Sequence, residues 1–314
     1  MLSYFVSYLI MASTYGIAAL ALNLQWGFTG LMNFGIGTFY FVGAYTSALL
    51  TTSASPDYVG GFGLPFIVGL IGAVALSGLL AYLLAFPALR LRGGFFAISM
   101  LAISETIRLI VKNEKWLTNG VWGIRGIPQP TRNLVGADLS EWIYLGIAGI
   151  LLYVFYRLTE VGVRSPWGRM LNAVREDEKM AEMSGKNSWN VKMQSFVFGS
   201  MIMGVAGALY AHYVGFISPS SFTPLMATFI VWLMILLGGT GSNKGVIFGA
   251  FVVWGVWIGS EFFIDFLPSG ITNKAGFVRM LLMGILLDAI LLLRPQGLFG
   301  REKIISKLGS SSNE

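Results

Sequence analysis

The chain has 314 residues, of which 55% are hydrophobic and only 11% are charged, with a net charge of +6. A water-soluble domain carries about a quarter charged residues, so a soluble fold is excluded. Cysteine is absent and His212 is the only histidine, which excludes disulfides, thiol nucleophiles and thiolate metal sites.

Apolar runs of about 17 to 23 residues recur along the chain, and this length crosses roughly 30 Å of hydrocarbon. They predict an all-α, polytopic transmembrane helix bundle of about nine spans. The first run lacks a charged leading segment, so we expect an uncleaved span. Most basic residues fall in alternate connections, which predicts an external N-terminus and a cytoplasmic C-terminus and gives no nucleic-acid signal. The expected spans are 4–24, 31–51, 64–86, 94–111, 142–158, 193–214, 224–238, 246–264 and 277–293.

Residues 23–37 mix amides and glycines between the first two apolar runs. Such a mixture predicts a broken helix, which membranes tolerate only where protein or a wet cavity covers the backbone. Transporters hold substrates at broken helices, so Asn33 and Gly35 are candidate residues of a translocation path. An ordinary turn is the alternative interpretation.

Glu105 lies about 11 residues into its span, near the middle of the bilayer at 1.5 Å per residue. Arg108 follows three residues later, within reach on the same helix face. A carboxylate at this depth has to be paired, neutral or facing a polar cavity. Glu105 is therefore either part of a translocation path or one half of a structural ion pair.

The connection 112–141 contains Pro128 and Pro130 and is expected to be an external loop rather than a helix. Within it, Asn119 and Gly120 belong to a second polar patch near the membrane. These two residues are further candidates for the translocation path.

A charged stretch at 160–192 interrupts the apolar pattern. Ser165 and Pro166 are typical of a helix start, and Gly185 is typical of a helix end. Apolar and charged residues alternate between them, so we expect one amphipathic helix beneath the membrane. Its many acidic residues would be repelled by anionic lipid, which favours a protein partner.

Motifs for catalysis are missing from the sequence. Residues 238–245 are rich in glycine but do not have the order of a phosphate-binding loop. No serine-hydrolase, metalloprotease or acidic metal motif is present. We therefore predict no catalytic residues, no metal and no cofactor, and ATP would have to be hydrolysed by another chain.

The segment GRMLNAVREDE at 168–178 and the residues up to 187 resemble the coupling-helix motif of bacterial branched-chain amino acid ABC-importer permeases, the M-type half more than the H-type half. The match extends from about residue 15 to residue 300. Two positions depart from the family pattern: Asn119 stands where a glycine pair is common, and 34–39 lacks a common Gly-His-Ala pattern. Further similar segments are LRLRGGFFA at 89–97, LTNGVWGI at 117–124, GVAGALYA at 204–211, GGTGS at 238–242 and RPQGLFG at 294–300.

The resemblance implies a permease subunit of the type II importer kind, in the inner membrane of a bacterial cell. It implies a single permease domain over 1–300 with a cytoplasmic coupling segment at 159–192 and a flexible cytoplasmic tail at 301–314. Implied partners are a second homologous permease in a heterodimer, two cytoplasmic ATPase subunits, a periplasmic substrate-binding protein and membrane lipid. The implied ATPase-coupling residues are Arg169, Arg175, Glu176, Asp177, Glu178 and Gly185.

Three other functions stay open at this point. Urea or short amides are carried by similar permeases, and the residues above do not separate them from branched-chain amino acids. An ion-coupled transporter without ATPases would have little use for the 160–192 segment. A membrane enzyme would need a catalytic constellation.

Overall fold

The computed structural model describes residues 2–54, 56, 58–91, 93–130, 132, 136–264, 275–294 and 296–300. The expected tail at 301–314 lies outside the described residues. In the first half of the chain the elements are α1 (Leu2–Leu22), the π-helical turn η1 (Asn23–Phe28), α2 (Ile36–Thr51), α3 (Phe66–Ala88), α4 (Gly94–Asn113), α5 (Lys115–Thr118), the 3₁₀ turn η2 (Gly120–Trp122) and β1 (Ile124–Arg125). In the second half they are α7 (Ala137–Arg164), α8 (Pro166–Glu176), α9 (Glu178–Met183), α10 (Ser188–Val214), β2 (Phe216–Ile217), η3 (Pro219–Phe222), the π-helical turn η4 (Leu225–Phe229), α11 (Ile230–Gly238), α12 (Asn243–Ile264) and α14 (Ala275–Leu293).

Six helices of the described part are long and apolar enough to cross a membrane, and two shorter apolar helices accompany them. The chain is therefore an all-α, multi-pass membrane protein. The six are Leu2–Phe28, Phe66–Ala88, Gly94–Asn113, Leu139–Arg164, Ser188–Val214 and Asn243–Glu261, and the two shorter ones are Ile36–Thr51 and Leu225–Gly238.

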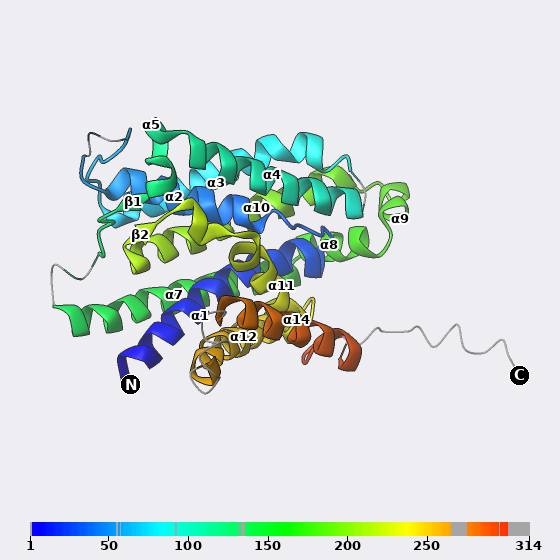
Figure 1. Cartoon of the computed structure of the whole chain (residues 1–314). Coiled ribbons are helices and arrows are strands. Elements are labelled where there is room, and N and C mark those ends of the chain that lie inside the picture. Colours follow the sequence, from blue (N-terminus) through cyan, green and yellow to red (C-terminus); the bar gives the residue numbers. More distant parts are fainter. Residues whose placement is uncertain are drawn as a thin grey trace, which may run out of the picture.

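The helices run between two ends of the bundle (Figure 1). At one end lie β1, β2 and α5, together with the N-terminus, where the Ser3 hydroxyl donates to the Glu141 carboxylate over 2.8 Å. At the other end lie α8 and α9 together with the last turn of α14. Beyond α14, the backbone N–H of Leu298 donates to the Leu237 carbonyl over 2.8 Å. The two ends of the described chain thus lie at opposite ends of the bundle.

Glycines allow α2 and α10 to pack closely in the core. A Cβ on Gly207 would collide with the Tyr40 carbonyl, and one on Gly43 would collide with the backbone of Gly204. Backbones this close are typical of small-residue contacts between membrane helices. Gly204 and Gly207 of α10 thus mark its contact with α2.

A second glycine contact joins α11 to α12. Gly238 and Gly245 face each other so closely that neither position has room for a Cβ, and Gly249 lies against the Met234 carbonyl. The Gly-xxx-Gly pattern at 245–249 therefore serves packing within this chain.

Two expectations about the connections were wrong. The loop 112–141 is not free of regular structure, because α4 runs to Asn113, α5 follows, and Ile124 and Arg125 of β1 pair antiparallel with β2. The span expected at 142–158 runs to Arg164 as α7, so its last turns carry the first charges of the 160–192 stretch.

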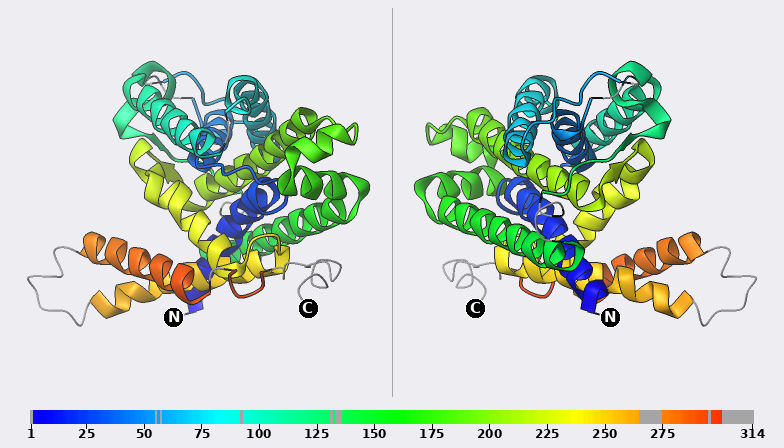
Figure 2. Two further views of the ribbon diagram at one scale, coloured as in Figure 1. Left: turned by 90° about the vertical axis from the view of Figure 1, so that its right-hand side faces the viewer. Right: turned by 90° about the vertical axis from the view of Figure 1, so that its left-hand side faces the viewer.

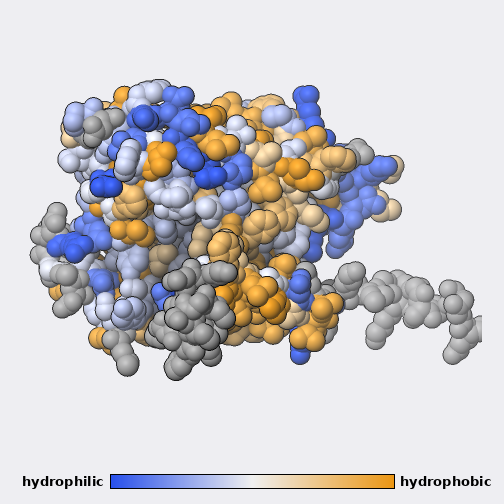
Figure 3. Space-filling model, viewed as in Figure 1, coloured by the Kyte–Doolittle hydropathy of each residue, from blue (hydrophilic) through white to orange (hydrophobic). Residues whose placement is uncertain are grey.

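The α12–α14 hairpin and α4 lie on the same side of the molecule, at its two edges, with α11 between them (Figure 2). On this side hydrophilic residues gather near both ends of the bundle, and hydrophobic residues dominate between them (Figure 3).

Candidate functional site

The coupling segment begins with a capped helix. The Ser165 hydroxyl accepts a hydrogen bond from the backbone N–H of Trp167 over 3.2 Å, and Pro166 occupies the first turn of α8. Both features are typical of helix starts. Gly168 lies so close to the Val163 carbonyl that a Cβ would not fit, which lets α7 turn directly into α8.

The coupling segment is two helices rather than the one helix predicted. Asp177 has extended backbone angles (φ −150°, ψ 105°), so α8 ends at Glu176. The Asp177 side chain accepts a hydrogen bond from the backbone N–H of Met180 over 3.0 Å and caps α9. An aspartate cap competes with helix continuation, and here the cap prevails. The predicted end is confirmed, because Gly185 has a left-handed φ of 76° just after α9.

One face of α8 is anchored in the bundle. Leu171 and Val174 are buried in a cluster that contains Leu24 and Phe28 of η1. Arg175 adds a hydrogen bond from its guanidinium to the Gly27 carbonyl oxygen. Gly27 lies one residue before the end of η1, and the last carbonyls of a helix have no donor within it, so η1 offers an acceptor to α8.

The opposite side of the segment faces outward. Arg169 and Glu176 are exposed, and so are Met180 and Met183, at 68% and 86%. Glu178 is held by Lys192 at 2.5 Å. Exposed methionines adapt to irregular partner surfaces, so this side combines charges with pliable apolar contacts.

Asn33 and Gly35 are buried within the bundle. The Asn33 side-chain amide donates to the Gln25 side-chain oxygen over 2.8 Å. The side-chain oxygen of Asn33 accepts from the backbone N–H of Gly35 over 2.7 Å. The backbone carbonyl of Asn33 accepts from the Trp232 indole over 3.1 Å. Residues 29–35 thus form a mostly buried, non-helical connection between η1 and α2, in which Asn33 is bonded to η1 and to a neighbouring helix. A role of Asn33 and Gly35 in a translocation path stays a prediction.

Asn119 and Gly120 lie at the β1–β2 end. Asn119 adopts a left-handed φ of 61°, and its amide donates to the Gly123 carbonyl over 3.1 Å. Asn119 lines a cavity of about 720 Å³ with Tyr58, Trp122 and others. The structure does not bring these residues together with Asn33 or Gly35, which lie elsewhere in the bundle.

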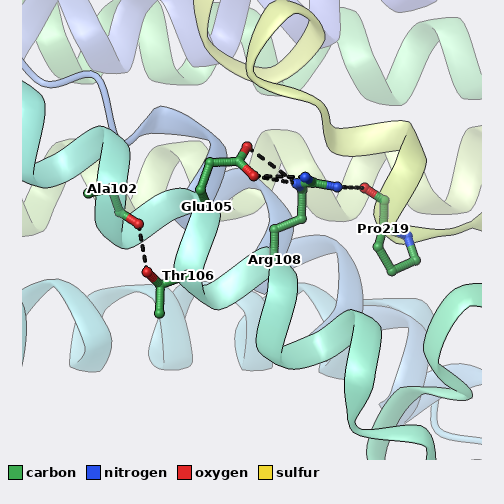
Figure 4. Close-up of polar contacts among 5 residues, drawn as sticks. All are labelled: Ala102, Glu105, Thr106, Arg108 and Pro219. Atoms are coloured by element: carbon green, nitrogen blue, oxygen red, sulfur yellow. Dashed lines mark hydrogen bonds and ion pairs between the residues drawn. The ribbon is translucent and has the colours of Figure 1, made fainter.

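The predicted pair of Glu105 and Arg108 is confirmed. The Arg108 Nη2 lies 2.7 Å from the Glu105 Oε2, and Nε donates to the same oxygen over 3.0 Å. The pair lies toward Pro219 in η3, whose carbonyl is 3.5 Å from Nη1 (Figure 4).

His212 joins three segments of the bundle. Its Nδ1 lies 2.8 Å from the Pro128 carbonyl, which can only accept, so this nitrogen carries the hydrogen. Its Nε2 lies 2.8 Å from the Ser47 hydroxyl. Among the described residues no group of three or more His, Asp or Glu could hold a metal ion.

Sequence reasoning missed the polar network around η1. The Asn23 amide donates to Asn243 over 2.9 Å, and Asn243 donates to Glu160 over 3.0 Å. Gln25 donates to the Phe196 carbonyl of α10 over 2.8 Å. The only signal in the sequence was the presence of amides in apolar runs, which marks a buried network without naming its partners.

Most of the chain matches one family of known proteins. A family model described as branched-chain amino acid transport system / permease component matches residues 4–291. The high-affinity branched-chain amino acid transport system permease protein LivM of Salmonella typhimurium is 33% identical over 334 residues, covering 97% of this chain and 72% of that protein.

More distant relatives include both permease types. The probable branched-chain amino acid transport permease protein LivM of Methanocaldococcus jannaschii is 28% identical, covering 95% of this chain and 94% of that protein. The high-affinity branched-chain amino acid transport system permease protein LivH of Escherichia coli is 24% identical, with 94% of each chain covered. No solved structure matches the chain.

Proposed function

This chain belongs to the family of branched-chain amino acid transport system permease components, and from that premise we propose that it is the membrane-spanning permease subunit of an ABC importer for branched-chain amino acids. The observation that carries the proposal is a match over 97% of the chain to a LivM permease. The chain itself is a translocation subunit and not an enzyme.

In this proposal nine helices cross the inner membrane of a bacterial cell. They are the six long apolar helices, the two shorter apolar helices and α14. The α8–α9 end is cytoplasmic, since it carries Arg157, Arg164, Arg169 and Lys186, and cytoplasmic loops are enriched in basic residues. The N-terminus at the other end is then external. The permease domain covers 1–300, the coupling segment 159–192, and 301–314 forms a cytoplasmic tail.

Two cytoplasmic ATPase subunits are the proposed partners of α8 and α9. The exposed charges of Arg169 and Glu176 would set the register of the contact, and Met180 and Met183 would fill apolar hollows. A second, homologous permease encloses the translocation path, and a periplasmic binding protein delivers substrate at the β1–β2 end. The existence of LivM and LivH relatives supports a heterodimer of two permeases.

The coupling mechanism follows from how α8 is anchored. ATP binding and hydrolysis displace the ATPase subunits, and α8 moves with them as a lever. Because Arg175 holds the Gly27 carbonyl and Leu171 packs in the cluster with Leu24, η1 moves with α8. Gln25 passes this displacement to α10 through the Phe196 carbonyl.

The substrate is tested through the binding protein encoded beside this chain. Calorimetric titration with leucine, isoleucine, valine, urea and acetamide is expected to give micromolar or tighter binding for the branched-chain amino acids. Binding of urea or acetamide alone would overturn the proposed substrate.

A further inference from the structure

Glu105 and Arg108 lie in the second half of α4, a helix long and apolar enough to cross a membrane. Glu105 is 11 residues after Gly94, the first residue of α4, and a rise of 1.5 Å per residue puts it about 16 Å along a helix of roughly 30 Å. A charged pair at this depth is costly unless it faces protein or water.

The pair keeps unused hydrogen-bonding capacity. Arg108 is 22% exposed and Glu105 is 32% exposed. The guanidinium has five N–H donors, and a carboxylate has room for about four acceptor contacts. The Glu105 carboxylate accepts hydrogen bonds from Nε and Nη2 of Arg108. The Nη1 atom of Arg108 has only a long contact of 3.5 Å to the Pro219 carbonyl. Neither side chain makes another hydrogen bond or ion pair within the described residues, so donors and acceptors remain on their open side.

The open side belongs to the proposed path rather than to lipid. Both charged side chains point from α4 toward η3, whereas Thr106 points away and donates to the Ala102 carbonyl of its own helix over 2.8 Å (Figure 4). The α12–α14 hairpin projects on the same side of the molecule as α4 (Figure 2). A partner permease seated between these edges would close a water-filled path over the pair.

We propose that Glu105 and Arg108 recognise the zwitterionic head of the transported amino acid, with Glu105 accepting from the α-ammonium group and Arg108 donating to the α-carboxylate. Arginine suits this task because its planar fork matches a carboxylate. Leu101 lies one turn before Glu105 on the same face of α4, and Ile98 lies two turns before it. Leu101 is half-buried and Ile98 is 70% exposed, so both offer apolar surface to the branched side chain of the transported amino acid. The inference rests on the proposed function, and it explains why an uncharged solute such as urea would gain little here.

The test uses the complete importer in proteoliposomes, with leucine uptake and ATP hydrolysis measured together. Glu105→Gln is expected to lower uptake per ATP about tenfold or more, the effect of losing a hydrogen bond to a charged group. Glu105→Asp keeps the charge but withdraws the carboxylate by one methylene, and it is expected to raise the KM for leucine while the complex still assembles. Thr106→Val, one residue away on the far side of α4, should behave like the wild type.

A labelling measurement keeps the inference testable if Glu105→Gln does not assemble. The chain has no cysteine, so Leu101→Cys gives this subunit a single target for a water-soluble thiol reagent, and labelling is read on this subunit after the importer's subunits are separated. Labelling during turnover with leucine should be slower than without it.

The outcomes separate the two levels of the account. Assembled Glu105→Gln and Glu105→Asp importers with wild-type leucine uptake, or leucine-independent labelling at position 101, would overturn the zwitterion role alone. A wild-type importer that carries urea and not leucine would overturn the proposed function and this inference together.

Discussion

Arg175 in α8 donates a hydrogen bond to the backbone carbonyl of Gly27 in the π-helical turn η1. These residues are 148 positions apart in the chain. Their contact joins the segment outside the bundle to the one point where α1 departs from regular helical geometry. Gly27 lies in the last turn of this helix, which ends at Phe28, and the carbonyls of a last turn have no partner within the helix, so Arg175 supplies one.

Replacing Arg175 with Met should uncouple transport from ATP hydrolysis. Methionine keeps much of the side-chain volume but cannot donate to Gly27. We expect basal ATPase activity to persist while uptake per ATP falls severalfold, as measured in proteoliposomes. Lys186→Met, an exposed change just after α9, is the matched control, and equal effects of both changes would contradict the role of the Gly27 contact.

Charge reversal at Glu176 and Asp177 should abolish substrate-stimulated ATPase activity while binding-protein docking survives. Glu176 is exposed toward the proposed ATPase contact, and reversed charges would repel its complement. Asp177→Asn separates charge from structure, because asparagine can still cap α9 at the Met180 N–H. Normal coupling in the double reversal would refute the lever.

Gly207→Ala should destabilise the bundle by about 1–3 kcal/mol, the range for overpacking a close contact. The added Cβ would meet the Tyr40 carbonyl, so α2 and α10 would have to separate. Thermal unfolding in detergent measures the effect. Gly146→Ala in α7 has open space around its Cβ and is expected to leave stability unchanged or slightly higher; a Gly207→Ala protein as stable as Gly146→Ala would contradict the packing.

Asp288→Leu should weaken assembly with the second permease. Asp288 is exposed on α14 in one stripe with Leu281, Ile285 and Leu292, and no ion pair to it occurs in the described part of the chain. Asp288 lies five residues before the last residue of α14, and a carboxylate that faces lipid is costly, so this stripe is expected to face the partner. Copurification of the two permeases measures the effect, and undiminished assembly would place the stripe in lipid instead.

Local patterns were sufficient to predict several features. Apolar run length predicted the long apolar helices, six of which in the described part are long enough to cross a membrane. The three-residue spacing predicted the contact between Glu105 and Arg108. Left-handed backbone at Gly185 likewise follows from its residue type. Each of these depends on neighbours along the chain.

Contacts between distant segments were not predictable from the sequence. The partners of Asn33 and Asn23 lie on η1 and α12, and nothing in the spacing of amides names them. Asp177 splits the coupling segment because its side-chain cap outcompetes a continuous helix, and the two outcomes differ by little energy. Pairing of β1 with β2 joins residues more than 90 positions apart, in a connection where prolines suggested a loop.

Uptake by the reconstituted importer tests the central claim most directly. Proteoliposomes would contain this chain, its partner permease and the ATPase subunits, with ATP inside and the liganded binding protein outside. If the chain is a permease of a branched-chain amino acid ABC importer, the vesicles will accumulate leucine, isoleucine and valine. This accumulation will require ATP hydrolysis, the binding protein and this chain. Accumulation that persists without ATP or without the ATPase subunits would contradict it.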